Sequence, residues 1–190
     1  MPCFAPLILV CLAYKPKTAK QGDRTMLTRR RMLGGVLASI ACFDSSLANT
    51  RHVKMSEHDI MILTKTVYGE ARGEGEVGIK AVVHLVLNRV RSDHPLFKHD
   101  KTISKTCLRK EQFECWDFKR EMASINVKSD EFLKLKSLVI DAHKEYTKGK
   151  DLTKDALFYV KRGKHLPKWA WGMRKTTVIN HHVYFKLLKI

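Results

Sequence analysis

Residues 76–91 restrict the fold of this sequence most, because apolar side chains occur in almost every direction around a stretch of helical length. A surface helix needs apolar residues on one face only, whereas a helix that is apolar over most of its circumference has to be surrounded by protein. Asn88 and Arg89 interrupt the apolar surface near its end. We therefore predict a central buried helix with apolar positions at Ile79, Ala81, Val82, Val83, Leu85, Val86, Leu87 and Val90.

A second helix is predicted immediately before the central one. Ser56 can cap its N-terminus, and Asp59 suits its first turn, where the partial positive charge of the helix dipole lies. Ile60, Leu63 and Val67 then fall on one face of the helix. This face is expected to pack against the central helix.

The segment 68–75 separates these two helices and contains glycines at positions 69, 73 and 75. Glycines at this density disfavour a continuing helix, so Glu70 is placed at a helix end or in the turn beyond it. Tyr68 stands beside it, and an acid against apolar groups can stay protonated near neutral pH and donate a proton. From the spacing alone, a solvated glutamate in a turn is the simpler interpretation.

The C-terminal half predicts one further helix followed by strands. Ser129 caps this helix and Gly149 ends it. Three short runs rich in branched and aromatic residues, 156–160, 176–180 and 183–189, are then typical of strands. Helices first and strands last predict one α+β domain. The apolar stripe of the third helix consists of Phe132, Leu135, Leu138, Ala142 and Tyr146.

The first 48 residues resemble an export signal in front of this domain. Residues 28–34 are basic, residues 35–43 are apolar, and a small-x-small cleavage site follows at Ser-Leu-Ala, which is the order of a secretory signal. The paired arginines before Met-Leu also resemble a twin-arginine signal. Met26 stands just before this signal and is an alternative translation start. We expect residues 1–48 to be an extension with a cleaved signal and residues 49–190 to be the catalytic domain. The mature protein is then expected in the periplasm or cell wall, without stable membrane insertion; an uncleaved anchor is the alternative.

The chain is strongly basic, with 36 Lys and Arg against 19 Asp and Glu and a formal net charge of +17. The part after residue 48 retains +12. Such a charge steers a protein toward a polyanion, which includes nucleic acid, an anionic membrane and an anionic cell wall; solubility alone is the other interpretation. We expect no nucleic-acid partner, since no basic helix, helix-turn-helix or RNP-like motif is present and an export signal argues against one.

Cys107 and Cys115 are the two cysteines beyond the predicted signal. In an oxidising compartment they can close a small disulfide loop, which contributes about 2–3 kcal/mol in the chain-entropy account. Two reduced, buried thiols are the alternative. Their spacing, without matching histidines, is poor for zinc, so no metal site is predicted.

Three blocks of the sequence form a pattern that spans about residues 57–186. The first is residues 67–90, a Gly-Glu-Ala-Arg-Gly-Glu turn followed by an Ala/Val-rich helix that closes in Leu-Asn-Arg-Val. The second is residues 112–116, QFECW, similar to a Gln-Phe-Ser-Cys-Trp element. The third joins residues 166–173 to residues 179–185, similar to Pro-x-Trp-Ala and Ile-Gly-x-His-x-Phe-Tyr segments. This combination resembles the cell-wall hydrolase family typified by bacterial spore-cortex-lytic enzymes.

The resemblance implies a single lysozyme-like domain, related to lytic transglycosylases, with one catalytic glutamate and no cofactor. That role falls on Glu70, the first acid of the turn, and makes the catalytic interpretation preferable to the solvated one. On the family's mechanism Glu70 protonates the bond between N-acetylmuramic acid and N-acetylglucosamine. It then removes a proton from the muramyl 6-hydroxyl, which leaves a 1,6-anhydro product. The implied partner is a peptidoglycan glycan strand, and we expect a monomer.

Glu74 is the candidate second carboxylate. A separation from Glu70 of about 5 Å would suit a retaining glycosidase, and one of about 6.5–9.5 Å an inverting one. The intervening glycines leave this separation open. A lytic transglycosylase needs one carboxyl group only, and on that mechanism Glu74 is structural.

Tyr68, Trp171 and His182 are the candidate substrate-binding residues. Trp171 falls in a loop, where its ring can stack on a sugar, and His182 matches the closing histidine of the family; structural roles are the alternative. The segment 158–160 stands where many members carry histidines, so no substrate contact is assigned to it. Other departures from the family pattern are Glu114 for a small residue, Asn180 for glycine, and the swapped order of Tyr184 and Phe185.

Three other functions stay open. A muramidase would cut the same bond by hydrolysis, and a catalytically inactive domain would only bind peptidoglycan. A zinc amidase would need two or three His or carboxylate ligands around an open coordination site. The available histidines show no such motif: His84, His143, His181 and His182.

Overall fold

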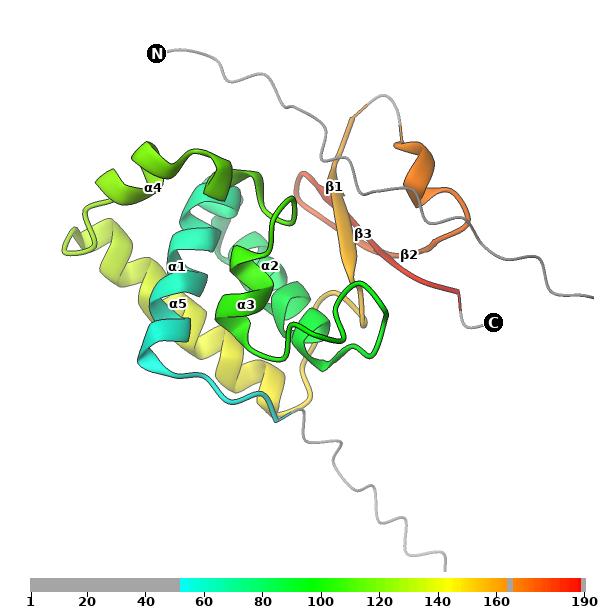
Figure 1. The fold of residues 1–190 in the computed structure, drawn as a ribbon, viewed down its shortest axis with the longest axis horizontal. Coiled ribbons are helices and arrows are strands. Elements are labelled where there is room, and N and C mark those ends of the chain that lie inside the picture. The colour runs from blue at the N-terminus through cyan, green and yellow to red at the C-terminus, as the bar shows by residue number, and fades with distance from the viewer. Residues whose placement is uncertain (1–51, 164–165, 189–190) are drawn as a thin grey trace, which may run out of the picture.

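The computed structural model describes residues 52–163 and 166–188. The expected export signal, residues 1–48, lies outside these residues. Within them, helices come first and a small antiparallel sheet comes last, which confirms the predicted α+β order (Figure 1). None of the described helices is long and apolar enough to cross a bilayer. The elements are α1 (Glu57–Ala71), α2 (Gly75–Arg91), α3 (Ile103–Leu108), the 3₁₀ turn η1 (Glu114–Asp117), α4 (Lys119–Ser124), α5 (Asp130–Thr147), β1 (Phe158–Lys161), the 3₁₀ turn η2 (Lys168–Ala170), β2 (Arg174–Ile179) and β3 (His182–Lys186).

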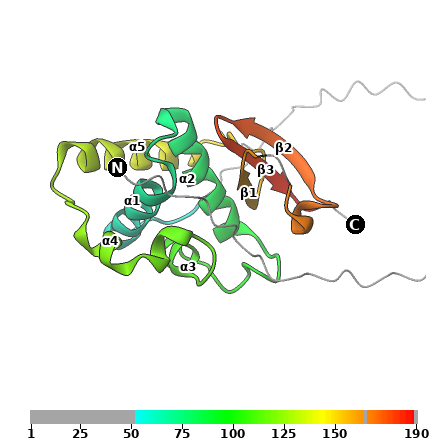
Figure 2. The ribbon, with the colours of Figure 1, turned by 90° about the horizontal axis from the view of Figure 1, so that it is seen from above.

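α2 lies at the centre of the helical part, as its apolar circumference predicts. Every residue from 81 to 90 is buried. α1, α3 and α5 all pack against α2, and the two views show it enclosed between them (Figures 1 and 2). Burying one Val or Leu side chain contributes about 1.5–3 kcal/mol. This helix therefore supplies a large share of the hydrophobic core.

α1 begins with a capping box and ends just after Glu70. The Ser56 hydroxyl accepts from the backbone N–H of Asp59 at 3.1 Å, and the Asp59 carboxylate accepts from the N–H of Ser56 at 3.1 Å. The second oxygen of Asp59 accepts from the N–H of Ser104 at 2.8 Å, which ties α3 to the start of α1. Gly75 opens α2 at a φ of 64°, a left-handed conformation that glycine adopts at little cost. The helix end predicted for Glu70 is confirmed.

The sheet has the order β1-β3-β2, with both pairs antiparallel. Tyr159 lies opposite Tyr184 on β3, and His182 lies two residues before Tyr184. Side chains alternate between the two faces of a strand, so these three share one face, here called the inner face. Phe158 and Phe185 lie opposite each other and share the other face.

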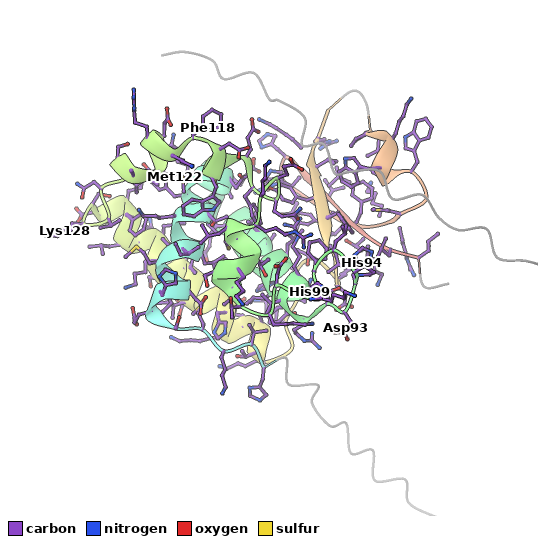
Figure 3. All side chains as sticks on the ribbon, in the orientation of Figure 1. Asp93, His94, His99, Phe118, Met122 and Lys128 are labelled. Carbon is purple, nitrogen blue, oxygen red and sulfur yellow. The ribbon has the colours of Figure 1, made fainter. Side chains whose placement is uncertain are left out.

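The loop 92–102 joins α2 to α3 and covers the other face of the sheet. The ring of Phe97 lies 5.7 Å from that of Phe158, and His94 meets Phe158 edge-on at 6.2 Å. Figure 3 shows His94 on the side of this loop that is nearest the sheet. Trp169 also packs on Phe158, at 5.8 Å. A second, smaller apolar cluster therefore holds the sheet to the loop.

Asn88, one of the two polar interruptions of α2, organises the connection from α5 to β1. Its amide donates to Asp151 at 3.0 Å, to Thr153 at 2.9 Å and to the carbonyl of Ala156 at 3.2 Å. The hydroxyl of Tyr146 donates to the Asn88 side-chain oxygen at 2.6 Å. A buried amide with these partners fixes the path of the chain into β1.

Candidate active site

Glu70 lies in the last turn of α1 and is held by two donors from distant parts of the chain. Its Oε1 accepts from the backbone N–H of Cys115 at 3.1 Å, and its Oε2 accepts from the hydroxyl of Tyr159 at 2.8 Å. These donors are 45 and 89 residues away in sequence. The side chain is half-buried. The fold thus fixes the carboxylate from both sides while leaving it partly open to solvent.

Gly69 allows the first of these contacts because η1 packs directly against α1. A Cβ at position 69 would stand 2.4 Å from the Cβ of Cys115 and 3.0 Å from its sulfur. The next residue, Trp116, donates from Nε1 to the hydroxyl of Thr66 on α1 at 3.0 Å. The Gln-Phe-x-Cys-Trp block therefore docks on the last turns of α1 and brings the N–H of Cys115 to Glu70.

Tyr159 presents the second donor from the inner face of the sheet. Burial, followed by the charge of Glu70, raises the pKa of Tyr159 well above its usual value, so its hydroxyl keeps its proton at neutral pH. The ring of His182 meets Tyr159 edge-on at 4.8 Å, and Tyr184 stacks on Tyr159 at 6.0 Å. Burial lowers the pKa of His182 against the opposing charges of Glu74 and Glu70. The His182 ring therefore stays neutral at neutral pH.

Arg89, the other polar interruption of α2, connects the two segments that carry the donors. Only 2% of this residue is exposed. Its Nε donates to the carbonyl of Leu157 at 2.8 Å, two residues before Tyr159. Its guanidinium also lies 5.1 Å from the ring centre of Phe113, two residues before Cys115. Arg89 thus contacts both of the segments whose residues donate hydrogen bonds to Glu70.

Glu74 joins the turn between α1 and α2 to the turn between β2 and β3. Its carboxylate accepts from the backbone N–H of His181 at 3.1 Å, and the His181 ring lies within 3.3 Å. Its carbonyl accepts a hydrogen bond from the Asn180 side chain. Asn180 has a φ of 49°, so an asparagine takes the left-handed position where the family pattern has glycine. These contacts give Glu74 a structural role beside the site.

The segments that surround Glu70 match a known protein family. The profile of the cell wall hydrolase family matches residues 73–185, which is more than half of the chain. This chain belongs to the cell wall hydrolase family. The match begins just after Glu70 and includes Cys115, Tyr159 and His182. Membership therefore rests on the residues around the glutamate rather than on the glutamate itself.

Two curated relatives of this cell wall hydrolase are spore cortex-lytic enzymes. The protein of Bacillus cereus is 29% identical over 131 residues, and that of Bacillus subtilis is 28% identical over 129 residues. These matches cover 69% and 68% of this chain but 45% and 38% of the relatives. The chain thus spans less than half the length of the curated relatives it matches.

Two solved structures share the fold of this cell wall hydrolase. The catalytic domain of the Bacillus cereus SleB protein matches with a TM-score of 0.55 and 30% identity, over 70% of this chain and 93% of that domain. The catalytic domain of the germination-specific lytic transglycosylase SleB from Bacillus anthracis matches with a TM-score of 0.54 and 30% identity, over 69% and 96%. The helical part followed by a three-stranded sheet is therefore the fold of the SleB catalytic domain.

The other predicted site residues of the cell wall hydrolase lie at different distances from its glutamate. Tyr68 is half-buried, packs on Phe132 at 6.2 Å and carries the guanidinium of Arg72 4.8 Å above its ring. His182 is on the inner face beside Tyr159, which places it next to Glu70. Trp171 is 68% exposed in the turn before β2. His182 thus joins the site directly, whereas Trp171 lies on the surface of the sheet region.

Glu114, which replaces a small residue of the family pattern, adds an acid to the site. It precedes Cys115 in η1 and is half-buried. Burial, followed by the charges of Glu70 and Asp117, raises its pKa. A negative charge at position 114 is thus disfavoured by burial first and by the neighbouring acids second.

Cys107 and Cys115 are free in the structure, and both are buried. They correspond to the second of the two alternatives, reduced thiols in the core. Burial raises the pKa of Cys107 to about 12. Burial and the nearby Glu70 carboxylate also raise the pKa of Cys115. Neither thiol has the exposed, electropositive surroundings of a reactive cysteine.

Sequence reasoning missed Tyr159 and Cys115 as the partners of Glu70. It assigned no contact to the strand 158–160, because this segment departs from the histidines of the family pattern. The alternation of residues along β1 would have placed Tyr159 on one face of the sheet, but it does not predict which face the helices contact.

Within the described residues, no group of three or more His, Cys, Asp or Glu is arranged to hold a metal ion.

Proposed function

We propose that this protein cleaves the glycan strand of peptidoglycan as a lytic transglycosylase, with Glu70 as its catalytic acid and base. The observation that carries this proposal is the double anchoring of Glu70 by Tyr159 and by the backbone of Cys115. A catalytic carboxyl group has to be held in one orientation to meet the glycosidic oxygen. The name of the Bacillus anthracis relative, a lytic transglycosylase, supports the reaction type.

The two donors differ in what they allow Glu70 to do. A backbone N–H can only donate, so Cys115 always marks Oε1 as an acceptor. A phenol can donate or accept, so Tyr159 can bond to either protonation state of Oε2. Tyr159 can therefore stay bonded to Glu70 whether or not the carboxyl group carries the proton. This arrangement lets one carboxyl group lose and regain a proton without moving.

The proposed reaction uses Glu70 twice, first as an acid and then as a base. Glu70 in its acid form delivers the proton to the oxygen between N-acetylmuramic acid and N-acetylglucosamine, and the C–O bond to the leaving sugar breaks. The muramyl 6-hydroxyl then attacks the anomeric carbon, and Glu70 takes the proton from that hydroxyl. The products are a free 4-hydroxyl on N-acetylglucosamine and a 1,6-anhydromuramyl end. No water is consumed, and no second carboxylate is needed.

We also propose that the protein acts outside the cytoplasm, in the periplasm or cell wall. The proposed substrate is found there, and residues 28–48 have the order of a signal. Fusing residues 1–48, and separately residues 26–48, to a reporter that folds only after export tests this proposal. Retention of both fusions in the cytoplasm would contradict it. Replacing Arg29 and Arg30 by lysine distinguishes a twin-arginine route from a general one.

The reaction is tested by digesting purified sacculi and identifying the products by mass spectrometry. We expect 1,6-anhydro ends from the wild type and loss of nearly all product from Glu70→Gln, which keeps the size of the side chain but cannot supply a proton. Glu76→Gln is the matched control, because Glu76 is exposed and pairs with Lys80 at 2.8 Å on the surface of α2. It should keep wild-type activity.

Each other product pattern indicates a different function. Reducing muramyl ends would show a hydrolytic muramidase, and free stem peptides would show an amidase. Binding to sacculi without any cleavage would show a non-catalytic peptidoglycan-binding domain. Undiminished activity of Glu70→Gln would rule out Glu70 as the catalytic acid whatever the products are.

A further inference from the structure

Most of the net positive charge of residues 49–190 lies in the C-terminal segment that forms the sheet. Residues 49–155 contain 21 basic and 17 acidic side chains, which nearly balance, whereas residues 156–190 contain eight basic side chains and no acid. Six of the eight lie in the described residues, on or next to the strands, and five of these six are exposed while the sixth is half-buried. These six define the basic sheet surface: Lys161, Arg162, Lys168, Arg174, Lys175 and Lys186. By register, Lys161, Arg174 and Lys186 lie on the inner face, whereas Lys175 lies opposite Phe185 on the other face.

No ion pair within the described residues compensates the charges of the basic sheet surface. Among residues 52–163 and 166–188, none of the six forms an ion pair. The helical part behaves differently, because six of its basic residues pair with acids. These are Lys80, Lys101, Arg109, Lys136, Lys144 and Lys150. A surface with one sign of charge raises the local concentration of ligands of the opposite sign.

This surface begins beside Glu70. Lys161 follows Tyr159 by two residues on β1, so the two side chains share the inner face, with their Cα atoms roughly 6.5 Å apart. The charge of Lys161 also acts on the pKa of His182, its partner across the strands. β1 is an edge strand of the sheet, in the order β1-β3-β2. Lys161 is therefore next to the residue that donates to Glu70.

An exposed aromatic side chain lies in the same stretch of the chain as these basic residues. Trp171 is 68% exposed and follows η2, between Lys168 and Arg174 in the chain. An exposed indole among cations is suited to a ligand that combines sugar rings with negative charges, since the ring stacks on the sugar and the cations pair with the anions. Peptidoglycan is such a polymer, because peptide stems with free carboxylates project from its muramyl residues.

We propose that the basic sheet surface binds the free carboxylates of the peptide stems on the strand that Glu70 cleaves. The inference rests on the proposed function and adds a substrate class to it: strands that carry stems with free carboxylates. The complementarity of charge and the position of Lys161 next to Tyr159 favour this occupant over a membrane. A lipid surface would meet the same cations but would give no reason for their continuity with the site.

The test compares two variants with the same net charge. The sheet variant carries Lys161→Gln, Arg174→Gln and Lys186→Gln, the three basic residues of the inner face. The control variant carries Lys128→Gln, Lys134→Gln and Lys148→Gln, at exposed positions in the helical part. Both are made in the mature chain with Glu70→Gln, and binding is measured on purified sacculi freed of attached polymers. The sacculi are used as isolated and after carbodiimide amidation of their carboxylates.

We expect the sheet variant to bind native sacculi about tenfold more weakly than its parent and the control variant to lose less than about twofold. Amidated sacculi should bind the parent as weakly as native sacculi bind the sheet variant. The sheet variant itself should not respond to amidation. The difference between parent and sheet variant should also shrink at high salt, because exposed charges are screened.

Three results would overturn the inference. Equal losses in the two variants would show an effect of net charge alone. Parental binding that is indifferent to amidation would show that carboxylates are not the ligand. Tighter binding to vesicles of 30% phosphatidylglycerol in phosphatidylcholine than to sacculi, lost in the sheet variant, would assign the surface to a membrane. Products of the active enzyme decide the proposed function separately: equal cleavage of native and amidated sacculi refutes only the inference, and no cleavage of either refutes the proposed function.

Discussion

The hydroxyl of Tyr159 donates a hydrogen bond to Oε2 of Glu70 at 2.8 Å, so a strand of the sheet supports a carboxylate at the end of a helix. The position of that strand depends in turn on α2. Asn88 and Arg89 hold the two carbonyls that immediately precede β1, at 3.2 Å and 2.8 Å. The Leu-Asn-Arg-Val ending of α2 thus positions β1 and, with it, the hydroxyl of Tyr159.

Replacing Tyr159 by phenylalanine is expected to lower activity by more than its loss of stability explains. The change removes one hydrogen bond to an ionisable carboxyl group, and such bonds contribute about 1.5–3 kcal/mol. We therefore expect kcat on sacculi to fall roughly tenfold to a hundredfold at a temperature where the variant stays folded, with a loss of stability similar to that of the control below. Release of muropeptides and scanning calorimetry on the same samples measure the two effects.

Tyr146→Phe is the matched control, because it removes a tyrosine hydroxyl that bonds to Asn88 at 2.6 Å in the core of the helical part. This variant should lose about 1–2 kcal/mol of stability, since the Asn88 oxygen loses a buried donor. Its kcat at a temperature where it stays folded should fall much less than that of Tyr159→Phe, because Asn88 keeps its bonds to Asp151, Thr153 and Ala156. If both variants lost activity in proportion to stability, Tyr159 would have no special role.

Gly69→Ala is predicted to disturb the site by displacing η1. A methyl group at this position would stand 2.4 Å from the Cβ of Cys115, and neither partner is the flexible end of a side chain. The N–H of Cys115 would then move away from Glu70. We expect a loss of roughly 1–3 kcal/mol in stability, as for other overpacked sites, together with a clear drop in kcat. Urea unfolding and sacculus digestion check the two parts.

Gly73→Ala supplies the comparison within the same turn. Nothing lies within 4 Å of a Cβ at position 73, and the residue does not have a left-handed φ. Alanine should therefore be tolerated, and the smaller entropy of the unfolded chain should add about 0.4–1 kcal/mol of stability. A severe loss here, equal to that at position 69, would mean that the whole turn rather than the contact with Cys115 is critical.

The two glycines show what the sequence could and could not predict. Both interrupt a helical pattern, and on that ground the end of α1 near Glu70 was predictable. The pattern does not reveal that Gly69 is needed for close approach of a segment 46 residues later in the chain. Local propensity determines where a helix stops, whereas the contact depends on how two elements dock.

The same distinction applies to the donors of Glu70. The burial of α2, the capping box at Ser56 and the strand-like character of residues 158–161 follow from periodicity and residue type. The meeting of Tyr159 with Glu70 does not, because it requires the sheet to present one particular face to α1. Asn88 and Arg89 were recognisable as polar residues on an apolar helix. Their partners in the loop before β1 became known only from the fold.

The two cysteines are expected to be unreactive while the protein is folded. Burial raises the pKa of Cys107 to about 12 and also raises that of Cys115, so almost no thiolate is present at pH 8. Ellman's reagent should modify neither thiol in the native protein and both in urea. An intact mass lower by two hydrogens, without any reaction in urea, would show the disulfide that the sequence leaves open.

His84 predicts how stability depends on pH. Its Nε2 lies 3.1 Å from the carbonyl of Ala142, and its Nδ1 accepts from the N–H of Leu152 at 3.0 Å, so both neighbours fit the neutral ring with its proton on Nε2. Burial lowers the pKa of His84 below the ordinary value of 6.5, against the weaker opposing effects of Ala142 and Asp151. Protonation of Nδ1 would break the bond to Leu152, at the start of the connection that Asn88 organises.

The free energy of unfolding should therefore fall as the pH drops below about 6.5, because the unfolded chain takes up the proton at His84 before the folded chain does. The contribution is fully present above that pH, and its loss has a slope of at most about 1.4 kcal/mol per pH unit for one site. Urea unfolding between pH 8 and pH 5 measures this loss of stability.

His84→Gln should be less stable at pH 8 but should lose less stability on acidification, because an amide can donate and accept without titrating. His94 and His182, whose pKa values are also lowered by burial, are present in both proteins and cancel in the difference. Parallel curves for the two proteins would show that His84 does not carry the pH dependence.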